Sequence, residues 1–240
     1  MNNSMRVILV SYASSLALIA FCGCGKNDPD PAVKVLSYST ARGWDFDQEI
    51  IQLDELSDLS ADVAEKFVSC SGAIYLNGLR DVDEPTAAAL AKTPAQLEMT
   101  GLEALTSPQL AKKLASQSEV LELNNVRTLT PEVTKSLSEN RSGLSLNGLN
   151  DLPEAVAAEL ANHHGRLWLN GITDLPKETA GKLASHQGPL WLAGVKSLPD
   201  DSIKVLLKHE SPIYFRELKN LSKLGARVVE KKWGFTEEKK

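Results

Sequence analysis

The chain has 240 residues, with 26 Lys and Arg against 31 Asp and Glu, and a formal net charge of −5. This acidic balance argues against binding of nucleic acid or anionic lipid through the overall charge of the body. Aromatic residues make up only 5% of the chain, and leucine is its commonest apolar residue. This composition is more typical of a repeat protein than of a globular enzyme.

The first 23 residues have the pattern of a secretory signal peptide. Arg6 supplies a positive start, and the apolar run from Val7 to Phe21 follows it. This run is shorter than the roughly 20 residues of a membrane-spanning helix, although an uncleaved anchor is the alternative interpretation. We therefore expect residues 1–23 to be removed and to take no part in the fold.

A lipid-attachment motif follows the apolar run. The segment Phe21-Cys22-Gly23-Cys24 resembles the lipobox of bacterial lipoproteins, in which a small residue precedes the cysteine that becomes lipidated. Gly23 before Cys24 fits this pattern, whereas the bulky Phe21 before Cys22 fits it badly. The resemblance implies a protein held in the bacterial cell envelope by lipid on Cys24, with its body in the periplasm or exposed outside.

The rest of the chain divides into four segments. Residues 24–32 are polar with two prolines and are expected to form the lipidated tether. Residues 33–50 show no repeat and are expected to cap one end of a repeat array. The apolar side chains of this cap are Val33, Val35, Trp44 and Phe46. A repeat region follows over residues 51–235, and residues 236–240 are a mixed-charge tail.

The repeat has a period of 23 residues. Counted from offset 0, eight units start at Ile51, Ile74, Leu97, Leu121, Leu144, Leu167, Leu190 and Ile213. The third unit has 24 residues, and because its Leu114 lies one place late, the extra residue precedes its helix. Apolar residues recur at offsets 0, 2, 5 and 8, and then at 12, 13, 16 and 17. Alternation followed by helical spacing predicts a short strand and then a helix in each unit.

Turn and cap residues recur between the apolar positions. Asn-Gly pairs after the strands predict sharp turns with left-handed backbone. Left-handed C-caps are predicted at Gly72, Gly165, Gly188 and Gly234. N-caps are predicted at Ser60, Thr130 and Ser222, and first-turn prolines at Pro131, Pro153, Pro176 and Pro199. A row of asparagines at offset 3 is interpreted as turn residues rather than ligands: Asn124, Asn147 and Asn170.

One unit of strand and helix cannot bury its own apolar face, but stacked units bury a continuous core. Strands pair ~4.8 Å apart whereas helices pack 8–10 Å apart, so the stack bends with its strands on the concave side. The sequence therefore predicts an α/β fold, a curved solenoid of about eight strand-turn-helix repeats. We expect one parallel sheet on the concave face, running roughly 34 Å from the first strand to the last.

The repeat resembles the leucine-rich-repeat family, and within it the atypical 23-residue repeats of bacterial secreted and surface proteins. The resemblance covers Ile51 to Gly234. The usual family motif has asparagine at the place of offset 5, where this chain always has Leu, Ile or Val, so the family's asparagine ladder is not expected. The resemblance implies a horseshoe that binds proteins or other ligands on its concave face.

Outward strand positions carry the candidate binding residues. Offset 1 places Trp168, Trp191 and Tyr214 in one register of adjacent strands. Rows of exposed aromatic side chains often mark binding surfaces, although cross-strand pairing alone stabilises each pair by a few tenths to ~1 kcal/mol. The candidate ligand-binding residues are Trp168, Trp191, Tyr214, Tyr75, Arg166 and Arg216. A protein partner is expected, and a glycan bound on the aromatic row is the alternative.

Three histidines at offset 19 are in register: His163, His186 and His209. Zinc needs nitrogens ~2.0–2.1 Å away, and helices 8–10 Å apart should keep these rings from converging on one ion. We interpret the histidines as polar or cationic residues near helix C-termini, where the helix dipole favours positive charge. The lone Cys70 is interpreted as a packing residue.

Enzyme signatures are absent from the sequence. It contains no G-x-S-x-G, no H-E-x-x-H and no phosphate-binding G-x-x-x-x-G-K-[ST] motif. We therefore expect no catalytic residues, no cofactor, no metal and no nucleic-acid partner. The predicted function is that of a non-catalytic binding or scaffolding lipoprotein. The alternative function is that of a carbohydrate-binding module that uses the aromatic row.

Overall fold

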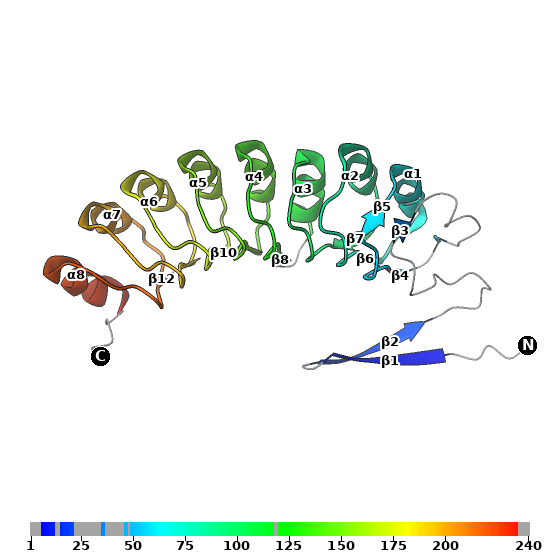
Figure 1. Ribbon diagram of the computed structural model, residues 1–240, viewed down its shortest axis with the longest axis horizontal. Coiled ribbons are helices and arrows are strands. Elements are labelled where there is room, and N and C mark those ends of the chain that lie inside the picture. Colours follow the sequence, from blue (N-terminus) through cyan, green and yellow to red (C-terminus); the bar gives the residue numbers. More distant parts are fainter. Residues whose placement is uncertain are drawn as a thin grey trace, which may run out of the picture.

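The computed structural model describes residues 6–12, 15–21, 35–36, 46–47, 49–117 and 120–234. Within these ranges the repeats form a curved solenoid, with helices along the convex edge and strands along the concave edge (Figure 1). The predicted α/β solenoid is confirmed. Cys24, Val33, Trp44 and the tail at residues 236–240 lie outside the described residues.

The strands at the concave edge carry the starts of the eight units. They are β4 (Ile50–Gln52), β6 (Ala73–Tyr75), β7 (Gln96–Glu98), β8 (Leu121–Glu122), β9 (Gly143–Ser145), β10 (Arg166–Trp168), β11 (Leu190–Trp191) and β12 (Ile213–Tyr214). Paired strands are parallel, and the unit starts lie opposite one another, as with Leu144 and Leu167. This register is the one that the 23-residue period predicts. A slip of one residue would turn every strand leucine out of the core.

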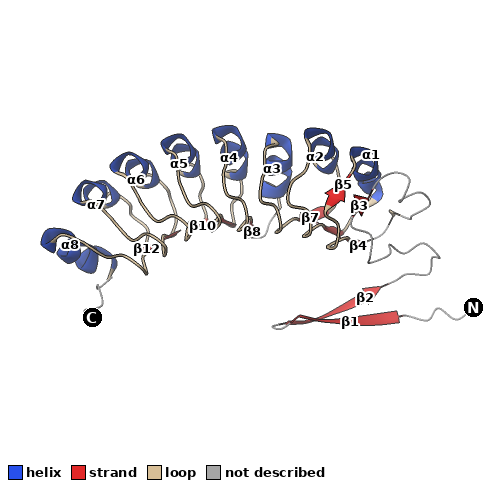
Figure 2. Ribbon diagram, viewed as in Figure 1, coloured by secondary structure: helices blue, strands red, loops and turns tan. Residues whose placement is uncertain are grey.

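The helices form the outer layer (Figure 2). They are α1 (Ala61–Ala64) with the 3₁₀ helix η1 (Glu65–Ser69), α2 (Glu84–Leu90), α3 (Pro108–Ala115), α4 (Pro131–Leu137), α5 (Glu154–Leu160), α6 (Lys177–Leu183), α7 (Asp200–Leu206) and α8 (Lys223–Trp233). Helix α3 begins eleven residues after Leu97, whereas α4 begins ten residues after Leu121. The extra residue of the third unit therefore precedes its helix, as predicted.

One hydrophobic core runs the length of the solenoid between strands and helices. Strand leucines such as Leu146 and Leu169 are fully buried, and so are the helix alanines Ala157 and Ala180 that face them. The small alanine side chains let the helices lie close to the sheet. The core is thus a repeated layer to which each unit adds the same inward positions.

Helix starts follow the predicted caps only in part. Thr130 and Ser222 accept N-cap hydrogen bonds, from the N–H groups of Val133 at 3.4 Å and Gly225 at 2.9 Å. Ser60 also occupies an N-cap position but makes no side-chain cap bond. The prediction that three prolines lie in the first turn was wrong, because they are extended N-cap residues: Pro153, Pro176 and Pro199.

Several glycines are required because successive coils lie too close together for a side chain, and not because the backbone there is left-handed. Of the glycines that the structure describes, only Gly234 has a positive φ, 69°. A Cβ on Gly148 would lie 2.4 Å from the carbonyl oxygen of Asn124, and one on Gly188 would lie 2.1 Å from that of Gly165. The turns predicted at the Asn-Gly pairs are present, but the left-handed backbone predicted for them was wrong. The predicted C-caps that were also wrong are Gly72, Gly165 and Gly188.

The concave sheet is not continuous, which corrects the prediction of a single sheet. Strands β4, β6 and β7 form one sheet, and β8 to β12 form another. At the break, the N–H of Leu97 donates to Oε1 of Gln117 at 2.6 Å, and Nε2 of Gln117 donates to the carbonyl of Leu97 at 3.0 Å. A carboxamide has the donor and acceptor of a peptide group, so Gln117 replaces the missing strand partner of β7.

Two further strand pairs lie before the second repeat. β3 (Val35–Leu36) pairs in parallel with β5 (Asp58–Leu59), and the ring of Phe46 packs 5.5 Å from that of Phe67. β1 (Arg6–Tyr12) and β2 (Ser15–Phe21) form an antiparallel hairpin from the segment predicted to be a signal peptide. That assignment stays a prediction. The described residues contain no helix with the length and apolar character that crossing a membrane requires.

Candidate functional site

The aromatic row, defined as Trp168, Trp191 and Tyr214, crosses β10, β11 and β12 on the concave face. Its residues are opposite one another in the strand register. Ring centroids are 4.8 Å apart in both pairs, with interplanar angles of 22° and 20°. This spacing is that of neighbouring strands, so pairing in register brings the rings into one stack. The structure therefore unites three of the predicted binding residues.

The stack is supported at its first ring by β9. A Cβ on Gly143 would lie 2.9 Å from the indole ring of Trp168, so any larger residue would force that ring to shift. The buried hydroxyl of Ser145 donates to Oδ1 of Asn124 at 2.6 Å and accepts from Nδ2 of Asn147 at 2.9 Å. The sequence signal for this support was the absence of a side chain at Gly143 beside a large aromatic residue of the next unit.

The stack presents ring edges to the concave face. Trp168 and Trp191 are half-buried, and Tyr214 is 47% exposed. The two indole N–H groups and the Tyr214 hydroxyl form no hydrogen bond with another described residue. Stacked rings cover one another's faces, so the row leaves only its two outer faces uncovered: that of Trp168, which lies against Gly143, and that of Tyr214, which points away from Trp191. A carbohydrate platform needs open ring faces, so this arrangement does not favour the carbohydrate alternative.

The remaining predicted binding residues divide into two groups. Arg166 and Arg216 are exposed; Arg166 lies on β10 on the same strand face as Trp168, and Arg216 lies in a bend two residues past Tyr214. Neither guanidinium forms an ion pair within the described part of the chain. Tyr75 lies on β6 in the other sheet, so the structure does not bring it to the aromatic row.

Charge is segregated along the concave face. The outward positions are offsets −1, 1 and 3 of each unit. The charged side chains at these positions are Asp54, Glu98 and Glu122 in the first four units, and Arg166 and Arg216 in the last four. The concave face therefore has an acidic N-terminal half and a basic, aromatic C-terminal half.

An asparagine ladder runs along offset 3. The N–H groups of Asn147, Asn170 and Ala193 donate to Oδ1 of the asparagine one unit earlier, at 3.3, 3.0 and 3.0 Å. The interpretation of Asn124, Asn147 and Asn170 as turn residues is confirmed, because each lies in a turn, but the sequence did not predict that their side chains also join successive units. No asparagine occupies offset 5, where no ladder was expected; the ladder of this chain runs along offset 3 instead.

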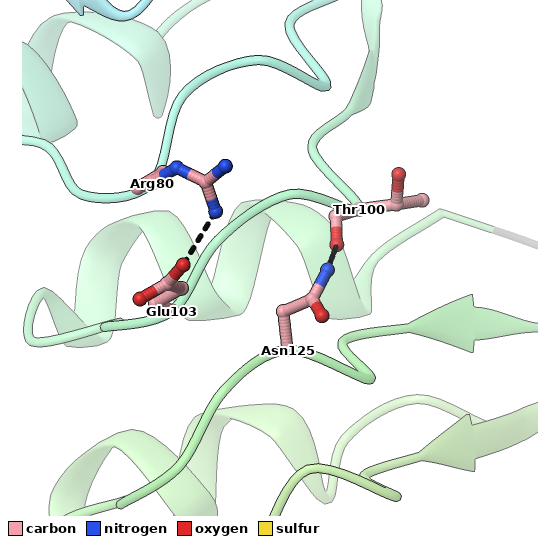
Figure 3. Close-up of polar contacts among 4 residues, drawn as sticks. All are labelled: Arg80, Thr100, Glu103 and Asn125. Atoms are coloured by element: carbon pink, nitrogen blue, oxygen red, sulfur yellow. Dashed lines mark hydrogen bonds and ion pairs between the residues drawn. The ribbon is translucent and has the colours of Figure 1, made fainter.

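The ladder stops where the sheet breaks. Asn77 accepts from the N–H of Thr100 at 2.9 Å, but threonine has no carboxamide oxygen to offer the next unit. Instead, Nδ2 of Asn125 donates to the carbonyl of Thr100 at 2.9 Å, close to the Arg80–Glu103 ion pair (Figure 3). A cavity of about 200 Å³ lies at this break between β7 and β8. Sequence reasoning placed the extra residue here but missed the side chains that bridge the gap.

A second stack, of imidazole rings, lies inside the solenoid. His163, His186 and His209 are 0%, 3% and 0% exposed, with centroids 5.7 and 6.0 Å apart and interplanar angles of 6° and 14°. The histidines lie just past the ends of helices α5, α6 and α7, as expected, but their rings are closer than the 8–10 Å of packed helices, and the expectation of a cationic residue was wrong because the rings are buried. Offset 19 lies past the helix, where successive coils approach the spacing of strands rather than that of helices.

The imidazoles are held by backbone groups. Gly165 N–H donates to His163 Nδ1 at 3.2 Å, and the Gly188 carbonyl accepts from His186 Nδ1 and His209 Nε2, each at 3.1 Å. His163 Nε2 and His209 Nδ1 are buried without a partner. Burial lowers the pKa of His163 and of His186 to about 4, and it lowers the pKa of His209 as well. The stack is therefore uncharged at neutral pH.

Two other kinds of site, a reactive thiol and a metal site, find no support in the described residues. Cys70 is fully buried, and burial raises the pKa of its thiol, so the thiolate form is disfavoured. Within the residues that the structure describes, no three His, Cys, Asp or Glu side chains are placed to hold a metal ion together. The concave face with its aromatic row is thus the candidate site for binding.

The chain matches no known protein family and no curated protein. Among solved structures it is similar to the crystal structure of an internalin from Listeria monocytogenes, with 15% sequence identity and a TM-score of 0.43. The similarity covers 73% of this chain and 51% of the internalin chain, so this chain spans about half the length of that one.

Proposed function

We propose that the protein is a non-catalytic leucine-rich-repeat module that binds a partner protein through the C-terminal half of its concave face. The observation that carries this proposal is the stack of Trp168, Trp191 and Tyr214, which is partly exposed and has free hydrogen-bond donors. Tryptophan, tyrosine and arginine are the residue types enriched at the energetic centres of protein interfaces. A rigid sheet beneath them limits the entropy lost on binding.

The same proposal includes a membrane anchor. Arg6, the apolar run after it and the Gly23-Cys24 pair support export and lipidation, which would place the body in the periplasm or outside the cell. Mass spectrometry of the mature protein is expected to give a lipid-modified N-terminus at Cys24. An unmodified N-terminus, or retention of residues 1–23, would contradict the anchor without affecting the binding surface.

Site-specific crosslinking in the native envelope tests the binding surface. A photoreactive phenylalanine derivative replaces Tyr214, which retains an aromatic ring in the row, and in a matched control it replaces Lys177 on α6, an exposed position of the helix layer. We expect a protein adduct at position 214 that is absent at position 177. The adduct should disappear when Trp168 and Trp191 are both changed to Ala in a chain that keeps its circular dichroism spectrum.

Three results would overturn the proposal. These are equal adducts at both positions, an adduct that survives the double Trp→Ala change, or an adduct that carries carbohydrate and no protein. The third result would support the carbohydrate-binding alternative.

A further inference from the structure

The C-terminal half of the concave face combines free positive charge with free hydrogen-bond donors. We propose that it binds an extended acidic peptide segment, whose carboxylates pair with Arg166 and Arg216 and whose apolar side chains lie on the aromatic row between them. This inference rests on the proposed protein-binding function and specifies its partner. It follows from the charge, the spacing and the hydrogen-bonding state of these residues.

The charge of the partner follows from the unpaired arginines. Arg166 and Arg216 are exposed and have no ion-pair partner in the described ranges, and no acid occupies an outward position of the last four units. A guanidinium pairs best with a carboxylate, through two parallel N–H···O bonds. The edges of aromatic rings also carry positive partial charge, so the stack adds to the attraction for anionic groups.

The spacing of the two arginines sets the spacing of the acids. Arg166 begins β10, and Arg216 lies just past the end of β12, two strands across the sheet and four residues further along the unit. Strands lie ~4.8 Å apart and rise ~3.3 Å per residue, which places the two Cα atoms about 16 Å apart. An extended peptide covers this distance in about five residues. Two acids about five residues apart, with apolar residues between them, fit the surface.

The free donors favour a peptide backbone between the acids. The indole N–H groups of Trp168 and Trp191 and the hydroxyl of Tyr214 form no hydrogen bond within the described residues. Burying them under a partner without acceptors would cost free energy at each group. The backbone carbonyls of an extended peptide supply acceptors at regular intervals, whereas a purely apolar partner supplies none.

The other half of the concave face restricts where such a peptide lies. Asp54, Glu98 and Glu122 repel carboxylates from the first four units. Repulsion by one half and attraction by the other fix the position of the peptide along the horseshoe, which is a source of specificity.

A displayed library of random peptides about 12 residues long, panned on the purified full-length chain, tests the inference. We expect enriched peptides to carry two acids four to six residues apart with apolar residues between them. Changing Arg166 and Arg216 together to Ala should weaken binding of such a peptide by about tenfold or more, while both Arg→Lys changes should retain part of it. Raising the salt from about 50 mM to about 500 mM should weaken binding too.

Arg127→Ala is the matched control, because Arg127 is exposed on a loop outside the strand face. It should bind the same peptides with unchanged affinity. Enriched peptides that lack acids, or binding that ignores the double Arg→Ala change, would overturn the acidic partner. If such peptides still depend on Trp168 and Trp191, the proposed protein-binding function survives.

The remaining outcomes are also decisive. Failure of the wild-type chain to enrich any peptide over the Trp168→Ala/Trp191→Ala chain would overturn both proposals. Binding of an acidic oligosaccharide with no enriched peptide would overturn the peptide in favour of a glycan.

Discussion

The first three and the last five strands of the concave face come from the same 23-residue repeat, yet they form separate sheets with different surfaces. In the last five strands every neighbour is paired, and aromatic, asparagine and histidine side chains each form a continuous row. The break before β8 coincides with the 24-residue unit, and there Gln117 and Asn125 bridge the gap with side chains. Pairing of neighbouring strands in register therefore brings residues of the same type from successive units into one row.

The largest expected effect comes from the core of the continuous half. Leu169 is fully buried at the centre of the five-stranded sheet, so Leu169→Ala should lower the free energy of unfolding by about 2–5 kcal/mol. Leu97 is also buried but lines the cavity at the break, so we expect its side chain to lose fewer packing contacts on truncation. Leu97→Ala should therefore cost less. Urea unfolding of both variants measures the difference, and equal losses would show that the break does not loosen its surroundings.

Acid should destabilise the C-terminal half first. Because folding lowers the pKa of His163 and His186 to about 4, the unfolded chain binds more protons than the folded chain between about pH 6.5 and pH 4. The stabilisation is complete above about pH 6.5 and is lost as the pH falls toward 4. Each histidine contributes on the order of 3 kcal/mol to this change, and their close contact makes the pair less than additive.

The first three units provide the internal comparison for acid unfolding. In place of histidine they have Cys70, Thr93 and, after the extra residue of the third unit, Gln117, and none of these side chains gains a proton between about pH 4 and pH 6.5. Hydrogen exchange, corrected for the intrinsic pH dependence of amides, should show β9 to β11 losing protection before β4 to β7. Changing His163 and His186 to Gln should remove most of the extra pH dependence, and an unchanged pH profile in that variant would contradict the assignment.

The 23-residue period was enough to predict the features that depend on spacing along the chain. The unit starts, the strand register and the late start of α3 all follow from counting residues. What depends on the distance between coils was not predictable in the same way, because that distance shrinks from the helices to the strands. His186 follows a helix, as its position in the repeat indicates, but it also lies where successive coils are close together. Asn147 lies in a turn, but its side chain also accepts a hydrogen bond from the next unit. Pairing Gly143 with Trp168 across units would have revealed the support of the aromatic row.

A smaller effect is expected from Gln117, the residue that substitutes for a strand. Gln117→Leu removes both hydrogen bonds to Leu97 and should lower the free energy of unfolding by about 1–3 kcal/mol. Gln117→Glu keeps an acceptor but turns a carboxylate toward the Leu97 carbonyl, so its loss should be at least as large at pH 7. Gln187→Leu is the matched control, because Gln187 is an exposed glutamine that also follows a helix, in the continuous half. It should change stability by less than about 0.5 kcal/mol, and a similar loss in both would remove the bridging role.

The smallest expected effect is a gain, from restoring the asparagine ladder at the break. Thr100→Asn would give the third unit the carboxamide that Asn147 has in the fifth, where Nδ2 donates back to Asn124 and Oδ1 accepts from the next unit. If the missing carboxamide keeps the two halves apart, the N–H of Asn124 gains an acceptor, and the free energy of unfolding should rise by about 0.5–1 kcal/mol. Thr128→Asn, on an exposed loop, is the control and should be neutral. A neutral Thr100→Asn would show that the extra residue before α3 holds the strands apart, so that no side chain at offset 3 can join them.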